Sequence, residues 1–131
     1  PLLPFNTKIT VKPHPNCPIK AADYPNLTMH ISMDPVGRLL EKSDIAYASA
    51  LTTAAVDAYE SGVPIISVLD PNILNLSPLR GCEGALYASN AEDLKDKFVS
   101  VVIGPKKIIR KKNFFWIDPQ LPRWRKLLIE K

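Results

Sequence analysis

The Lys-Pro-His-Pro sequence from Lys12 to Pro15 is the first part of the chain that could bind a charged ligand. Its prolines fix the backbone dihedral φ, so the imidazole of His14 is held with little conformational entropy to lose on binding. A fixed histidine beside the Lys12 ammonium can contact a phosphate group. The alternative is a proline-rich turn in which His14 is only solvated.

Three hydroxyl side chains, those of Ser49, Thr52 and Thr53, lie where a helix is predicted to begin. Hydroxyls together with free backbone N–H groups at a helix start can bind an anion, which the helix dipole favours. Asp57 follows on roughly the same helix face and could accept hydrogen bonds from a ribose. The structural alternatives are N-capping by Ser49 or Thr52 and a favourable interaction of Asp57 with the helix dipole.

Short β-branched and apolar runs, separated by amphipathic stretches, predict the elements that must position these residues. A helix over 35–42 is expected to be capped by Asp34, and one over 91–102 by Asn90. The predicted strands are 7–12, 27–32, 45–48, 64–69 and 85–88, and the predicted helices are 35–42, 52–61, 91–102 and 121–129.

This alternation of strands and helices predicts βαβ units with a parallel sheet. The expected fold is a single Rossmann-like α/β domain of three layers over residues 1–103. In such sheets ligands bind beyond the carboxyl ends of the strands. The loops after Lys12, Ala48, Leu69 and Ala88 are therefore expected to carry function.

The composition excludes several classes of protein. The chain has 131 residues, of which 46% are hydrophobic and 23% charged, and no apolar run is long enough to span a membrane. Two cysteines, Cys17 and Cys82, cannot build a disulfide framework and offer no zinc-ligand spacing, so we expect a protein of the reducing cytoplasm. No Gly-x-Gly-x-x-Gly follows the first strand, which argues against a dinucleotide oxidoreductase. Because the first residue is Pro1, we expect a piece of a longer protein.

The positive charge is concentrated in the last part of the chain. Residues 1–103 hold 8 Lys/Arg and 11 Asp/Glu, a net charge of −3, whereas residues 104–131 hold 9 basic and 2 acidic residues, a net charge of +7. One interpretation is a tail that lies on the anionic inner membrane face through its basic cluster, Lys106, Lys107, Arg110, Lys111 and Lys112. The other is that Trp124, Leu127 and Leu128 dock the last helix onto a neighbouring domain. No nucleic-acid-binding motif is present, so no nucleic-acid partner is expected.

The spacing around the predicted second helix resembles the donor-binding half of a GT-B glycosyltransferase. In that superfamily an acidic residue lies five positions before the glycine of a Gly-x-Pro that opens the next strand, and Asp57 precedes Gly62-Val63-Pro64 in this way. Thr52 and Thr53 resemble the Ser/Thr motif of bacterial sialyltransferases, capsule Kdo transferases and CDP-glycerol glycerophosphotransferases. These families also have a His-Pro motif after an earlier strand, as in His14-Pro15.

The resemblance covers about residues 8 to 94 and is greatest to surface-polysaccharide biosynthesis proteins of bacteria. It implies that His14, Thr52 and Thr53 bind the phosphate of a nucleotide-sugar donor and that Asp57 binds the ribose. Lys12, Ser49 and Arg80 are further candidates for donor contacts. By the same resemblance, no metal or other cofactor is needed, and the acceptor site and catalytic base belong to an N-terminal domain of the longer chain.

Two other functions remain open at this point. A nucleotide-sugar 2-epimerase would share the architecture and the phosphate site at a helix start. A Rossmann-like interaction domain without enzymatic activity would share the fold alone. If the transferase interpretation holds, residues 1–131 are expected to bind the donor without turning it over.

Overall fold

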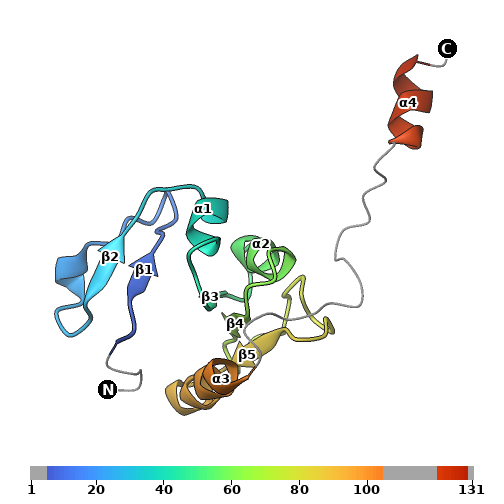
Figure 1. The fold of residues 1–131 in the computed structure, drawn as a ribbon. Coiled ribbons are helices and arrows are strands. Elements are labelled where there is room, and N and C mark those ends of the chain that lie inside the picture. The colour runs from blue at the N-terminus through green and yellow to red at the C-terminus, as the bar shows by residue number, and fades with distance from the viewer. Residues whose placement is uncertain (1–5, 105–120, 130–131) are drawn as a thin grey trace.

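A computed structural model of the protein describes residues 6–104 and 121–129. Five short strands form two parallel sheets (Figure 1). β1 (Ile9–Val11) pairs with β2 (Met29–Ile31), and β3 (Ala46–Ser49), β4 (Ile65–Val68) and β5 (Leu86–Ala88) form a sheet of order β3-β4-β5. The predicted α/β class with parallel strands is confirmed.

The single sheet that the sequence predicts is divided in two, which is a correction. Among the described residues no ladder joins β1 or β2 to β3, β4 or β5. β1 and β2 have three residues each. β5 also has three residues, but it packs against α3 and joins the larger sheet, whereas β1 and β2 have no comparable packing against α1, α2 or α3 that would hold them beside that sheet.

Helices cover the three-stranded sheet on both faces, which gives the predicted three layers (Figure 1). α2 (Ala54–Glu60) packs on β3 and β4 from one side, and α3 (Ala91–Ile103) packs on β4 and β5 from the other. α1 (Val36–Leu40) lies against α2. A short 3₁₀ helix, η1 (Ala21–Asp23), was not predicted and lies beside β2.

The core is centred on β4. Ile65 is fully buried and belongs to the cluster that contains Leu40, Ala58 and Tyr59. Ile66, also fully buried, points to the opposite face of the sheet, which α3 covers. Burial on both faces is typical of a parallel strand that helices cover on each side, and β4 is the central strand of its sheet.

The helix ends follow local hydrogen bonding, which corrects one predicted cap. The Asn90 side chain accepts from the Asp93 N–H at 2.8 Å and caps α3, as predicted. Asp34 does not cap α1, because Pro35 occupies the N-cap position and the Asp34 N–H is bonded to the Ser32 hydroxyl in the preceding turn. α2 ends before Gly62, whose φ of 76° is the left-handed conformation that glycine tolerates best.

The last described element is α4 (Pro122–Ile129), in which no residue is buried. The predicted basic cluster between residues 106 and 112 lies outside the described residues. In the described part of the chain, no helix has both the length and the apolar composition that a membrane crossing requires.

Candidate functional site

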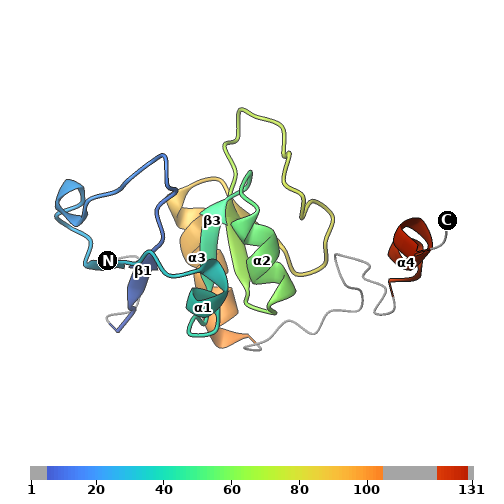
Figure 2. The ribbon, with the colours of Figure 1, turned by 90° about the horizontal axis from the view of Figure 1, so that it is seen from above.

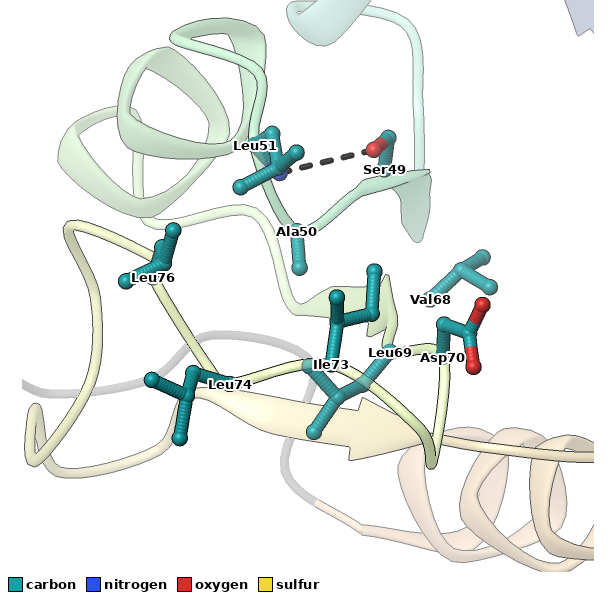
Figure 3. A pocket seen from close by; sticks show the side chains of 9 residues that line it. All are labelled: Ser49, Ala50, Leu51, Val68, Leu69, Asp70, Ile73, Leu74 and Leu76. Carbon is teal, nitrogen blue, oxygen red and sulfur yellow. Dashed lines mark hydrogen bonds between the residues drawn. The ribbon is translucent and has the colours of Figure 1, made fainter.

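A pocket of about 340 Å³ opens where β3 and β4 reach their carboxyl ends (Figure 3). These are two of the strand ends at which the sequence predicts function. Figure 2 shows the connection between β4 and β5, residues 69–85, extending beyond the ends of the strands. The pocket is lined by Ser49, Ala50 and Leu51 after β3, by Val68, Leu69 and Asp70 after β4, and by Ile73, Leu74 and Leu76 in the long connection.

Most of the pocket wall is apolar. Ala50 is buried at the base, and Ile73 points toward it from the opposite side (Figure 3). Leu51, Leu74 and Leu76 lie at the opening with exposed fractions of 64%, 80% and 67%. Such a surface favours contact with an apolar group or with the face of a ring, because covering it removes apolar area from water.

Asp70 is the one charged residue among the described side chains that line the pocket. Its Oδ1 atom accepts from the Asn72 N–H at 2.8 Å and from the Asn72 amide at 3.2 Å. A carboxylate there repels a phosphate and accepts hydrogen bonds from sugar hydroxyls. Sequence reasoning selected the loop after Leu69 without assigning Asp70 a role; the signal was its position directly after the buried strand.

The three candidate hydroxyls form a tight turn before α2. The Thr52 N–H donates to the Ser49 carbonyl at 3.2 Å, and the Ser49 hydroxyl accepts from the Leu51 N–H at 3.4 Å. The Thr52 hydroxyl accepts from the Ala54 N–H at 3.3 Å, but the N-cap residue of α2 is Thr53, whose side chain makes no capping hydrogen bond, so neither Ser49 nor Thr52 is the N-cap. Each hydroxyl still has its own hydrogen to donate to a ligand.

The backbone N–H groups in the first turn of α2 already have acceptors within the chain, which counts against an anion site built from them alone. The Ala55 N–H donates to the Thr52 carbonyl, and the N–H groups of Val56 and Asp57 donate to the Thr53 carbonyl at 2.9 and 3.1 Å. The turn from Ser49 to Thr53 supplies the acceptors that the first helical turn otherwise lacks. A phosphate would therefore depend on side-chain donors here.

Asp57 lies in α2 with an exposed side chain. Its backbone carbonyl accepts from the Ser61 N–H and hydroxyl, whereas its carboxylate makes no hydrogen bond or ion pair with any described residue. The carboxylate is thus available to an external donor.

The Lys12 and His14 side chains lie in a turn after β1. His14 is exposed, its carbonyl accepts from the Cys17 N–H at 2.9 Å, and its Nδ1 atom accepts from the Asn16 N–H at 3.1 Å. Because Nδ1 is an acceptor, the neutral imidazole carries its hydrogen on Nε2 and presents a donor to solvent. Lys12 Nζ donates to the Met33 carbonyl at 3.3 Å.

Arg80 lies in the long connection between β4 and β5. Its guanidinium is exposed and donates through Nη1 to the Asn75 carbonyl at 3.3 Å. This bond uses one of the five N–H hydrogens of the guanidinium, so the side chain can contact an anion as well.

The candidates therefore fall into two groups. Ser49, Thr52 and Thr53 follow one strand of the three-stranded sheet, beside the pocket that Ser49 helps to line. Lys12 and His14 follow a strand of the other sheet, and among the described residues no hydrogen bond joins them to the turn that holds Ser49, Thr52 and Thr53. The described residues hold no group of three or more side chains of the types that bind metals.

Comparison of the chain with protein-family models, with curated proteins and with solved structures gives no match.

Proposed function

We propose that this chain is the nucleotide-sugar donor-binding domain of a glycosyltransferase that acts in bacterial surface polysaccharide biosynthesis. The observation that carries the proposal is the pocket at the carboxyl ends of the parallel strands β3 and β4. Nucleotides bind at this edge of open α/β sheets. The spacing of Thr52, Thr53 and Asp57 before Gly62-Val63-Pro64 adds the resemblance to donor-binding domains.

The chemistry of the pocket suggests which end of the donor it takes. Leu51, Ile73 and Leu74 offer an apolar surface to the base, and the Asp70 carboxylate accepts from the hydroxyls of a sugar. The same carboxylate disfavours the phosphates, which must then lie outside the pocket. We place them toward the hydroxyls of Thr52 and Thr53, with the ribose toward Asp57 or Asp70.

In this proposal the phosphate charge is neutralised by donors on side chains, with His14, Lys12 and Arg80 as the cationic or N–H candidates. Lys12 and His14 are on the other sheet, so their part in the site requires the two sheets to approach each other in the complex. The acceptor site and the catalytic base belong to a further domain of the longer protein. Residues 1–131 then bind the donor without transferring its sugar.

The test is a titration of the ¹⁵N-labelled 131-residue chain with CMP, CDP, UDP and GDP, followed by amide chemical shifts. We expect shifts at residues 49–54 and 68–76 for at least one nucleotide, with a Kd near millimolar, or about −4 kcal/mol, because only one side of the site is present. An absence of shifts at millimolar nucleotide contradicts the proposal. Shifts at 49–54 and 68–76 without any at 13–16 would remove His14 from the site.

Two variants separate the roles of the carboxylates. Asp70→Asn is expected to weaken nucleotide binding about five- to tenfold, since the hydrogen bonds of a charged acceptor to sugar hydroxyls are lost or weakened. Asp44→Asn is the matched control, because Asp44 is also exposed but precedes β3, at the opposite end of the strand. Asp57→Asn should weaken binding of a nucleoside monophosphate and leave inorganic phosphate unaffected. Equal loss for both ligands would assign Asp57 to the electrostatics of the helix start.

A second candidate is an interaction domain without a small ligand. The exposed fractions of Leu51, Leu74 and Leu76 favour it, because apolar side chains gathered at an opening also suit contact with another protein. If the second candidate is right, no nucleotide shifts the amides of the pocket. Leu74→Ser and Leu76→Ser would then abolish binding to the rest of the longer protein.

A further inference from the structure

We infer that Arg80 is the residue through which the pocket binds the phosphate of its ligand, and that the same guanidinium holds one wall of the pocket. Because the ligand is taken to be a nucleotide, this assignment rests on the proposed function. Lys12 and His14 reach such a phosphate only if the two sheets approach each other, whereas Arg80 is already bonded to the pocket wall.

Arg80 is bonded to the segment that forms one wall of the pocket. Its Nη1 atom donates to the Asn75 carbonyl at 3.3 Å, and Asn75 lies between the lining residues Leu74 and Leu76. This carbonyl belongs to the peptide bond that joins Asn75 to Leu76, so the guanidinium lies directly beside the wall. Since Arg80 is exposed, as are both leucines at the opening, its charge is presented to solvent next to the pocket.

The position of Arg80 is fixed by the turns around it. The neighbouring Leu79 side chain is fully buried in the core, and the Arg80 N–H donates to the Ser77 carbonyl at 3.1 Å. The Ser77 N–H in turn donates to the Asn75 side chain at 3.0 Å. Residues 75–80 thus form one hydrogen-bonded unit that is anchored to the core. A ligand that meets the guanidinium there loses little conformational entropy in ordering it.

The charge of Arg80 can pair with an anion from outside the chain. Arg80 is the one basic residue in the connection over residues 69–85, and it forms no ion pair with a described residue. Its bond to Asn75 occupies a hydrogen on Nη1 and leaves those on Nε and Nη2. This edge of a guanidinium pairs with two oxygens of one phosphate group. Arg80 can therefore hold the wall and bind a phosphate at the same time.

The charges around the pocket are separated, which sets the direction of the ligand. In Figure 3, Leu51 and Leu76 lie at one side of the pocket and Asp70 lies at the other. Arg80 is bonded beside Leu76, and Thr52 follows Leu51, so both belong to the side away from Asp70. The 2′ and 3′ hydroxyls of a ribose point away from its 5′ phosphate. A nucleotide therefore fits with these hydroxyls toward the Asp70 carboxylate and its phosphate toward the Arg80 guanidinium.

The experiment is a titration of the ¹⁵N-labelled 131-residue chain with inorganic pyrophosphate at low salt. We expect shifts of the amides of residues 75–80 and of the Arg80 Nε–H signal, which Arg80→Gln identifies by its loss. Added salt should reduce these shifts, because it screens exposed charges. An absence of shifts at residues 75–80 overturns the assignment, whether or not nucleotides bind. Shifts with pyrophosphate but with no nucleotide support the anion contact of Arg80 and contradict the proposed function.

Variants separate the phosphate contact from the support of the wall. Arg80→Gln is expected to weaken binding of a nucleoside diphosphate about fivefold, the upper range for one exposed ion pair, and binding of the nucleoside less. Arg80→Lys should recover part of the loss, because it keeps the charge without the paired N–H groups. Arg38→Gln is the matched control, since Arg38 is also exposed but lies in α1, outside the pocket lining.

Two results with these variants would overturn the assignment. Equal losses for the nucleoside and the nucleoside diphosphate in Arg80→Gln would show that Arg80 acts on the wall alone. A larger loss of nucleoside diphosphate binding in Lys12→Gln or His14→Gln than in Arg80→Gln would place the phosphate at the other sheet. Far-UV circular dichroism verifies that each variant is folded.

Discussion

The two sheets of this protein are built from similar residues and are packed very differently. In β4, Ile65 and Ile66 are fully buried between α2 and α3. In β1 and β2 no residue is buried, and the buried side chains near them are Pro13 and Ser32 in the adjoining turns. Strand-forming residues are thus enough to make a parallel ladder, but helices on both faces are needed to make it a core.

The largest expected effect tests this contrast with one change made in both sheets. Ile65→Ala should lower the free energy of unfolding by about 3 kcal/mol, because it removes a fully buried side chain and leaves a cavity. Ile9→Ala on β1, where the side chain is half-buried, should cost at most about 1 kcal/mol. Urea unfolding followed by far-UV circular dichroism measures both. Similar losses for the two variants would mean that both sheets share one cooperative core.

A smaller effect compares two tyrosines within the three-stranded region. The Tyr59 hydroxyl donates to the Glu83 carbonyl at 2.9 Å, so Tyr59→Phe should cost about 1 kcal/mol. The Tyr87 hydroxyl is buried without a hydrogen-bond partner among the described residues, so Tyr87→Phe should be neutral or stabilising by up to about 1 kcal/mol. The same urea measurement applies. A destabilised Tyr87→Phe would show that this hydroxyl has a partner in solution.

The smallest expected effect is a pH dependence at the start of α3. The Lys97 ammonium donates to the Asp93 carboxylate, and so does the Ser89 N–H, which together lower the pKa of Asp93 from its ordinary value. A carboxylate with a lowered pKa stabilises the fold above its ordinary pKa, and this contribution is lost as the pH falls through the lowered value. Asp93→Asn should therefore flatten the loss of stability below about pH 4. An unchanged acid profile would show that the pair adds nothing in solution.

Much of the fold could be predicted from the sequence because its signals are local. Asn90 before Glu92 and Asp93 indicates a helix start, and the run from Pro64 to Leu69, which is apolar except at Ser67, indicates a strand covered on both faces. The separation of the two sheets could not be predicted, since it depends on which strands pair across long stretches of chain. Strand propensity in β1 does not specify its partner.

The candidate site was predicted less completely than the fold. The turn from Ser49 to Thr53 lies between β3 and α2, where the sequence placed it. The sequence did not show that carbonyl oxygens of this turn accept from the N–H groups at the start of α2, because that pairing depends on the geometry of the turn. The apolar opening formed by Ile73, Leu74 and Leu76 was missed because these side chains are in a connection without regular structure. That these three side chains line the same pocket follows only from the path of the connection between β4 and β5.

The long connection between β4 and β5 has one further consequence, which follows from Leu79. This side chain is fully buried in the core, and hydrogen bonds from the N–H groups of Leu79, Arg80 and Cys82 close the turns around it. A connection fixed at an interior point behaves as two shorter loops, each with its own closure entropy. The segment 71–76 can therefore change in length or sequence while residues 77–85 keep their path to the start of β5. The shape of the pocket opening is in this way separable from the folding of the sheet, so variants of residues 71–76 can change what the pocket accepts at little cost in stability.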